Sequence, residues 1–349
     1  MRNHAGFFNS RAIPVFTIIV TTILIFAPAG DASDNCHADS IQMELFSVVQ
    51  SAINNERFDI ADSAATTYRM AFPMAPEGYL ASAGWMVAQS TTEADGTYEQ
   101  LILKDIATVL SLTEPFKDSI AFDMALVHLF RGHAFTYRSL FKAKFGSKIS
   151  SVRDGYRAKS EYEKGLKCDS TFNDLKLGLG GFHYWKTDKA GFFRTIGLIS
   201  NDREKGIEQL LLARDSSCFS SEPAVNALIW IYLNEGKADS TILLSNLMYR
   251  NYPNGCLYLW PKALAFFNSG QIDSSLHTFN EIRSRLHNPG NGYNLIECDY
   301  MIVNCLELLE QLDKVKEVAS RLEEYLEIVP EEIKDKQSSK IKYLYKRSQ

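Results

Sequence analysis

Residues 222–289 decide the fold, and they read EPAVNALIWIYLNEG (222–236), KADSTILLSNLMYRNYP (237–253), GCLYLWPKALAFFNSG (255–270) and QIDSSLHTFNEIRSRLHNP (271–289). Gly236 and Gly270 are 34 residues apart, and each follows an apolar segment with helical periodicity. A second amphipathic segment follows each glycine and ends at Pro253 or Pro289. Because glycine permits a tight turn and proline cannot continue a helix, this stretch predicts two consecutive helical hairpins.

The same spacing recurs along the chain, where a turn residue precedes a proline by seventeen positions. The pairs are Glu56 and Pro73, Tyr98 and Pro115, Gly236 and Pro253, and Asp313 and Pro330. No convincing strand pair interrupts the helical pattern. We therefore expect an all-α fold, an α-solenoid of about seven helical hairpins over residues 42–349 with a C-terminal capping helix at 331–346. Such a stack is expected to curve and to present one concave face.

A 34-residue unit with its turn near position 15 and a proline near position 32 resembles the tetratricopeptide repeat (TPR) family, which implies a TPR-like scaffold for proteins or peptides. The central region, about 130–255, also resembles the tetratricopeptide repeat protein 39 family and the related inclusion-body-clearance proteins. This second resemblance rests on Gly178, Gly180 and Gly181, then Gly197, then Asp202-Arg203-Glu204 and Gly206. It implies architecture alone, with an insertion at 184–201 inside one unit. Gly180 is expected to let the paired helices approach closely.

The first 29 residues have the pattern of an export signal. Arg2 and Arg11 form a positive region, residues 12–26 are apolar, and Ala27-Pro28-Ala29 supplies a small-residue cleavage site. We expect cleavage after Ala29, a linker at 30–41, and a periplasmic or secreted protein. The alternative is an uncleaved segment, 12–29, that anchors the protein to the cell envelope.

Charge and motifs argue against several functions. The net charge of −5 disfavours nucleic-acid binding, and no sequence motif of a hydrolase, metalloprotease or nucleotide-binding enzyme is present. The six cysteines have no metal-binding spacing, and Cys298 and Cys305 are too far apart on one helix to form a disulfide. The sequence therefore predicts no enzyme, no cofactor and no metal.

The TPR resemblance implies that the first helix of each hairpin lines the concave face. Mapped onto this chain, the inward positions give Tyr184, Trp185, Asn226, Trp230, Asn234, Trp260, Phe267 and Asn268. Tryptophan supplies contact area and asparagine can bind a backbone amide, so these residues are the expected partner-binding site. The alternative is that the aromatic residues pack against neighbouring helices.

Three functions remain open from the sequence. The first is an exported scaffold that binds a protein or peptide and contacts a membrane only if the N-terminus stays uncleaved. The second is a small-molecule binder or enzyme that uses 184–201 as a lid and His183 in its pocket. The third is an envelope-assembly component held by the N-terminal segment.

Overall fold

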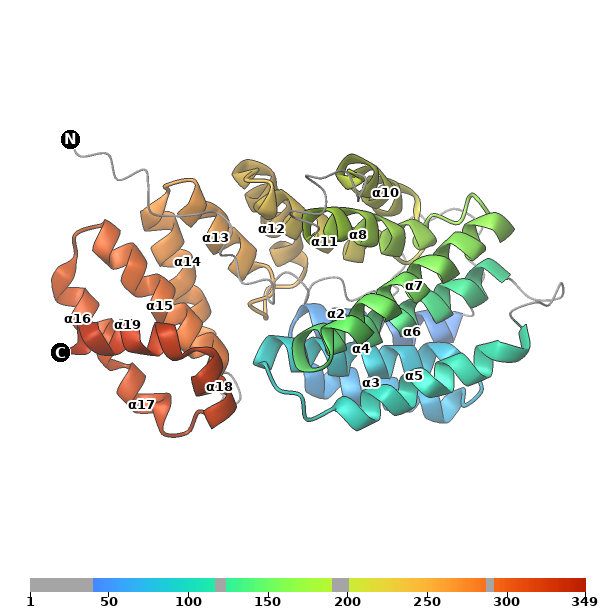
Figure 1. Cartoon of the computed structure of the whole chain (residues 1–349), viewed down its shortest axis with the longest axis horizontal. Coiled ribbons are helices and arrows are strands. Elements are labelled where there is room, and N and C mark those ends of the chain that lie inside the picture. The colour runs from blue at the N-terminus through green and yellow to red at the C-terminus, as the bar shows by residue number, and fades with distance from the viewer. Residues whose placement is uncertain (1–39, 117–123, 190–200, 287–291) are drawn as a thin grey trace. The chain divides into compact units, whose positions relative to one another are not determined.

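The computed structural model describes residues 40–116, 124–189, 201–286 and 292–349. The expected signal or anchor segment, most of the linker and Gly197 therefore lie outside the described residues. All regular elements of the described chain are helices (Figure 1). They follow one another as seven consecutive pairs and then three short C-terminal helices, which confirms the predicted all-α solenoid of helical hairpins.

Spatial clustering divides the chain into two compact units. Unit 1 runs to Leu228 without residues 54–57 and 92–95, and unit 2 consists of those two short segments and Ile229–Gln349. The first four helix pairs are α2 (Ser40–Asn54) with α3 (Phe58–Ala71), α4 (Pro76–Glu93) with α5 (Glu99–Thr113), α6 (Met124–Phe145) with α7 (Lys148–Cys168), and α8 (Asp174–Lys189) with α10 (Arg203–Ser216). A single 3-10 turn, η1 (Glu114–Phe116), follows α5.

The remaining helices continue the same arrangement. The pairs are α11 (Ser221–Asn234) with α12 (Ala238–Asn251), α13 (Leu259–Asn268) with α14 (Ile272–Arg285), and α15 (Gly292–Leu308) with α16 (Leu312–Ser320). The short helices α17 (Leu322–Leu326), α18 (Glu331–Lys336) and α19 (Ser338–Ser348) complete the chain.

Five of the seven hairpins turn at a residue in the left-handed backbone region. These residues are Glu56, Ala94, Gly236, Gly270 and Glu310. At Gly236 the amide of Lys237 donates to the carbonyl of Tyr232, and the same bond joins Gln271 to Phe266 and Gln311 to Leu306. This six-residue closure is the Schellman motif, which needs a positive φ at its turn residue.

Two of the turn residues predicted from the sequence, Tyr98 and Asp313, are wrong. Ala94 and not Tyr98 has the left-handed conformation, because Tyr98 has a φ of −80° directly before α5. Glu310 and not Asp313 turns the last hairpin, since Asp313 lies in the first turn of α16. Three of the expected prolines do follow the second helix of a hairpin: Pro73 follows α3, Pro115 lies in η1 after α5, and Pro253 follows α12.

Close helix contacts in unit 1 depend on glycine. The ring of Tyr162 on α7 lies between Gly132 of α6 and Gly178 of α8, where added β-carbons would come within 2.3 Å and 2.1 Å of it. Gly180 of α8 meets Gly206 of α10 backbone to backbone, as the sequence predicts for Gly180. Only glycine leaves room for these approaches, so the glycines of the middle hairpins set how tightly the helices pack.

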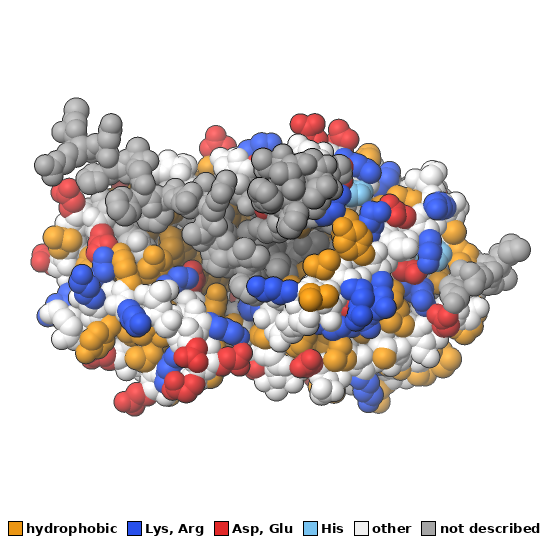
Figure 2. All heavy atoms as spheres, in the orientation of Figure 1, with side chains coloured by type: hydrophobic (Ala, Val, Ile, Leu, Met, Phe, Trp, Pro, Cys, Tyr) orange, Lys and Arg blue, Asp and Glu red, His pale blue; other side chains and the backbone are white. Residues whose placement is uncertain are grey.

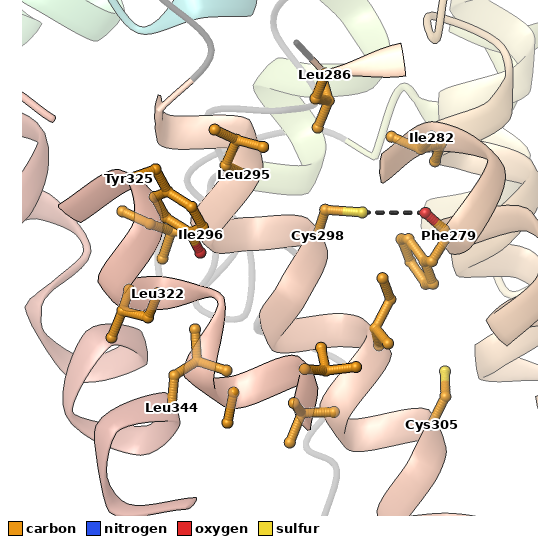
Figure 3. Close-up of a cluster of buried hydrophobic side chains, with 14 of the residues drawn as sticks. Phe279, Ile282, Leu286, Leu295, Ile296, Cys298, Cys305, Leu322, Tyr325 and Leu344 are labelled. Carbon is orange, nitrogen blue, oxygen red and sulfur yellow. Dashed lines mark hydrogen bonds between the residues drawn. The ribbon is translucent and has the colours of Figure 1, made fainter. Parts of the chain in front are cut away.

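Unit 2 has a continuous apolar core between α13, α14, α15, α16 and α19 (Figure 3). Cys298 and Cys305 are free thiols in this core, as their spacing predicts, and Cys298 donates to the carbonyl oxygen of Phe279 at 3.2 Å. Burial raises the pKa of the Cys305 thiol to about 11. These cysteines therefore act as small core residues.

Two boundaries differ from the sequence prediction. Helix α8 continues to Lys189, so the first residues of the expected insertion at 184–201 are helical, and residues 190–200 lie outside the described chain. The capping helix expected at 331–346 is divided at Gln337 into α18 and α19. The side-chain Nε2 of Gln337 donates to Oε2 of Glu297 on α15 at 3.1 Å, which fixes the break against the core.

Candidate functional site

All four tryptophans of the chain lie on the first helix of a hairpin. Trp85 is on α4, Trp185 on α8, Trp230 on α11 and Trp260 on α13. The first helices also contain every residue of the predicted partner-binding site. We call the side chains of α2, α4, α6, α8, α11, α13 and α15 the first-helix set.

In unit 1, the predicted residues Tyr184, Trp185 and Asn226 have different exposures. Tyr184 is fully buried, and its ring meets the half-buried ring of Trp185 edge to face at 4.9 Å. The guanidinium of Arg203 lies over the Tyr184 ring at 5.7 Å. Asn226 is buried, and its Oδ1 accepts no hydrogen bond.

In unit 2, five predicted residues range from buried to exposed. Trp230 is 2 % exposed and its indole N–H has no hydrogen-bond partner. Trp260 and Phe267 are half-buried against the apolar core, with the Trp260 ring 5.9 Å from that of Phe279. Asn234 is half-buried, and Asn268 is exposed at the end of α13.

Buried polar atoms without a hydrogen-bond partner concentrate on the first helices. Seven of the nine such side-chain atoms in the described chain belong to this set, namely Gln50 Oε1, Glu77 Oε2, Trp85 Nε1, Ser90 Oγ, Arg131 Nε, Asn226 Oδ1 and Trp230 Nε1. Of these, Arg131 Nε lies 3.4 Å from Glu161 Oε2 and is therefore ion-paired, which leaves six without a partner. The other two are Arg203 Nε on α10 and Ser245 Oγ on α12. Leaving such an atom unpaired costs about 1–3 kcal/mol, so native proteins seldom retain many.

Sequence reasoning found Asn226 and Trp230 but missed Gln50, Trp85 and Ser90. Trp85 is the fourth tryptophan and stands in the first helix of the second hairpin, so the same criterion that selected the other three could have selected it. Nothing in the sequence distinguishes Gln50 or Ser90 from ordinary helical polar residues, because their unpaired state depends on packing.

The three histidines in the described part of unit 1 have partners. His183 Nδ1 is 2.7 Å from Gln209 Oε1, and burial lowers the pKa of its imidazole. His128 Nδ1 is 2.8 Å from Glu161 Oε2, and His133 Nδ1 is 2.8 Å from the Tyr162 hydroxyl. Each therefore stabilises a helix contact.

The acidic side chains near these histidines are also held by structural partners. The carboxylate of Asp154 on α7 accepts hydrogen bonds from Arg138 at 2.8 Å and from Lys142 at 3.0 Å. The hydrogen bonds and charges of these two bases outweigh burial and lower the pKa of Asp154. Glu161 has a pKa of about 2 because His128, Lys164 and Arg131 outweigh the effect of its burial. In the part of the chain that the structure describes, no group of three or more histidine, cysteine or acidic residues could hold a metal ion.

None of the helices within the described ranges is long and apolar enough to cross a bilayer. Comparison of the chain with protein-family models, with characterised proteins and with solved structures gives no match.

Proposed function

We propose that the chain is an exported scaffold of the TPR type that binds an extended segment of a partner protein through its first helices. The unpaired polar atoms on these helices carry the proposal. In unit 1 they include a donor, the indole N–H group of Trp85, and acceptors, the side-chain carbonyls of Gln50 and Asn226; in unit 2 they include the indole N–H group of Trp230. An extended peptide offers alternating N–H and C=O groups, and it can pair with these enclosed atoms when first-helix side chains change rotamer on binding.

The other first-helix residues suit the same ligand. The half-buried rings of Trp185 in unit 1 and of Trp260 and Phe267 in unit 2 supply apolar contact area on the first helices. The unpaired donors and acceptors of Trp85, Trp230, Gln50 and Asn226 are uncharged, which favours recognition of backbone over a charged side chain. The N-terminal pattern at 1–29 places the scaffold outside the cytoplasm in this proposal.

The test is cross-linking in the native host, followed by mass spectrometry of the proteins that co-purify. Wild type is compared with Asn226→Leu and Trp230→Phe, which remove the unpaired atoms while keeping apolar bulk. We expect both variants to recover the main partner at about a tenth of the wild-type level or less, because one lost buried hydrogen bond costs about 1–3 kcal/mol.

Ser245→Ala is the matched control, since it removes an unpaired buried atom from a second helix. It should recover the partner at the wild-type level. Equal recovery in all four proteins would contradict a binding role for the first helices. The mass of the N-terminal peptide of the purified protein tests export separately, with Gly30 expected as the first residue.

A further inference from the structure

The outer face of α7 combines exposed apolar side chains with cations. Ile149 is 84 % exposed, Val152 59 % and Tyr156 53 %. Their spacing of three and then four residues places them in one stripe along the helix. Three exposed large apolar side chains on one face of a helix indicate a surface that binds a partner or a membrane.

Lysine and arginine flank this stripe on both sides. Arg153, Arg157 and Lys164 lie along one edge, and Lys148 and Lys159 along the other. Arg157 forms an ion pair with the buried Asp154 at 3.3 Å, and Lys159 pairs with Glu163 at 2.6 Å. Within the described chain, neither Lys148 nor Arg153 has an acidic partner. The first turn of α7 contains no acidic residue, so the positive end of the helix dipole adds to the charge there.

The space-filling view agrees with this placement. Lysine and arginine side chains gather over the part of the molecule where Figure 1 shows α7, with hydrophobic side chains beside them (Figure 2). The chain as a whole is acidic, with a net charge of −5, so this concentration of cations is local.

We propose that the face of α7 formed by Lys148, Ile149, Val152, Arg153 and Tyr156 docks on an anionic phospholipid surface. An apolar stripe bordered by cations is the pattern of helices that lie in the membrane interface. Isoleucine and valine enter the acyl boundary, tyrosine favours the headgroup level, and lysine and arginine reach lipid phosphates. The side chains of Ile149, Val152 and Tyr156 protrude from the surface, as insertion into a deformable lipid layer requires. A protein partner could bind protruding apolar side chains only if it had a matching groove.

This contact is distinct from the proposed partner-binding function, because α7 is a second helix and contains none of the unpaired atoms of the first-helix set. It also differs from the membrane contact expected of an uncleaved N-terminus, which rests on insertion of the apolar segment 12–29. The two proposals therefore fail independently.

The experiment measures co-sedimentation of the full chain with vesicles of phosphatidylcholine, with and without phosphatidylglycerol. Arg2 and Arg11 can also favour anionic vesicles, so the contribution of α7 is read from the difference between wild type and the α7 variants, in which residues 1–29 are unchanged. We expect preferential binding to the anionic vesicles that weakens as salt rises. Lys148→Gln with Arg153→Gln should reduce this preference about thirtyfold, since each cation near an anionic surface contributes about fivefold.

Ile149→Gln with Val152→Gln should also reduce binding to the anionic vesicles. Leu243→Gln with Leu247→Gln is the matched control, because these leucines are exposed on α12 without a cation on each side. It should bind like wild type. Amide exchange supplies a second readout, with protection of residues 148–160 expected on anionic vesicles alone.

Three outcomes would overturn the proposal. The first is equal binding to both vesicles without protection of α7. The second is wild-type binding by both α7 variants. The third is self-association of the chain that both α7 variants abolish while vesicle binding persists, which would assign this face to a second copy.

Discussion

Gly180 of α8 and Gly206 of α10 bring two helix backbones into direct contact, since a β-carbon on either glycine would lie 2.7 Å from the carbonyl oxygen of the other. Alanine at either position must push the helices apart, and overpacking of this kind costs about 1–3 kcal/mol. We expect Gly206→Ala to lower the free energy of unfolding by that amount in urea denaturation followed by circular dichroism.

Gly155→Ala on α7 is the control for this prediction. The nearest atoms to its added β-carbon are at 3.6 Å and 3.9 Å, an ordinary contact distance. Because alanine favours a helix over glycine by about 1 kcal/mol, this variant should be as stable as wild type or more so. An unchanged urea midpoint for Gly206→Ala would mean that the two backbones are not in contact.

Glu310 turns the last hairpin with a φ of 58°, a conformation that glycine adopts without strain. We expect Glu310→Gly to raise the free energy of unfolding by about 1 kcal/mol, because left-handed backbone costs an ordinary residue about 1–2 kcal/mol and glycine loses part of that gain in chain entropy. Thermal unfolding by calorimetry measures the change.

The reverse substitution, Gly236→Ala, should cost about the same amount. No atom lies within 4 Å of a β-carbon added to Gly236, whose φ is 70°, so any loss of stability comes from the backbone alone. Shifts of the same sign in the two variants would be inconsistent with this explanation.

His133 makes the stability of the α6–α7 hairpin depend on pH. Burial lowers the pKa of its imidazole to about 3, against an unfolded value of 6.5. Between pH 6.5 and about 3, His133 is therefore protonated in the unfolded chain but neutral in the folded chain. The free energy of unfolding falls as pH decreases from 6.5 towards 3. Above pH 6.5 His133 contributes no pH dependence.

We expect His133→Gln to reduce the slope of the stability profile between pH 6.5 and about 5, and groups other than His133 titrate in both proteins. The wild-type slope should exceed that of the variant by about 0.7 kcal/mol for each pH unit at pH 6.5, where half of the unfolded chains hold the proton, and by about 1.4 kcal/mol near pH 5. Urea midpoints at a series of pH values give both slopes. Parallel profiles would show that His133 titrates normally in the folded protein.

The sequence predicted the helical solenoid because its period of glycine and proline is a local property. Gly236, Gly270 and the prolines after α3, α5 and α12 were read from spacing alone. Glu310 and Ala94 were not predicted because neither residue type favours the left-handed region; at Glu310 the hydrogen bond from Gln311 to Leu306 accompanies that conformation.

Less of the candidate site could be predicted from the sequence, because the site depends on packing between distant residues. Helical spacing placed Trp230 and Trp260 on first helices but could not say that Trp230 is buried while Trp260 is half-buried against Phe279. It identified Gly180 as a residue for close helix approach but did not reveal that the ring of Tyr162 fills the space beside Gly178. Burial and pairing depend on neighbours that are distant in sequence, which a single helical pattern does not contain.

Ser90 on α4 and Ser245 on α12 form a matched pair that separates folding from binding. Both are buried, and neither hydroxyl oxygen has a hydrogen-bond partner. Alanine removes the unpaired group at little loss of volume, so each variant should unfold at the wild-type free energy or up to about 1 kcal/mol above it. Ser90 belongs to the first-helix set and Ser245 does not, so Ser90→Ala alone should weaken recovery of the cross-linked partner. A loss of stability above about 1 kcal/mol in either variant would mean that the hydroxyl is paired in solution, and its place among the unpaired atoms that support peptide binding would then be withdrawn.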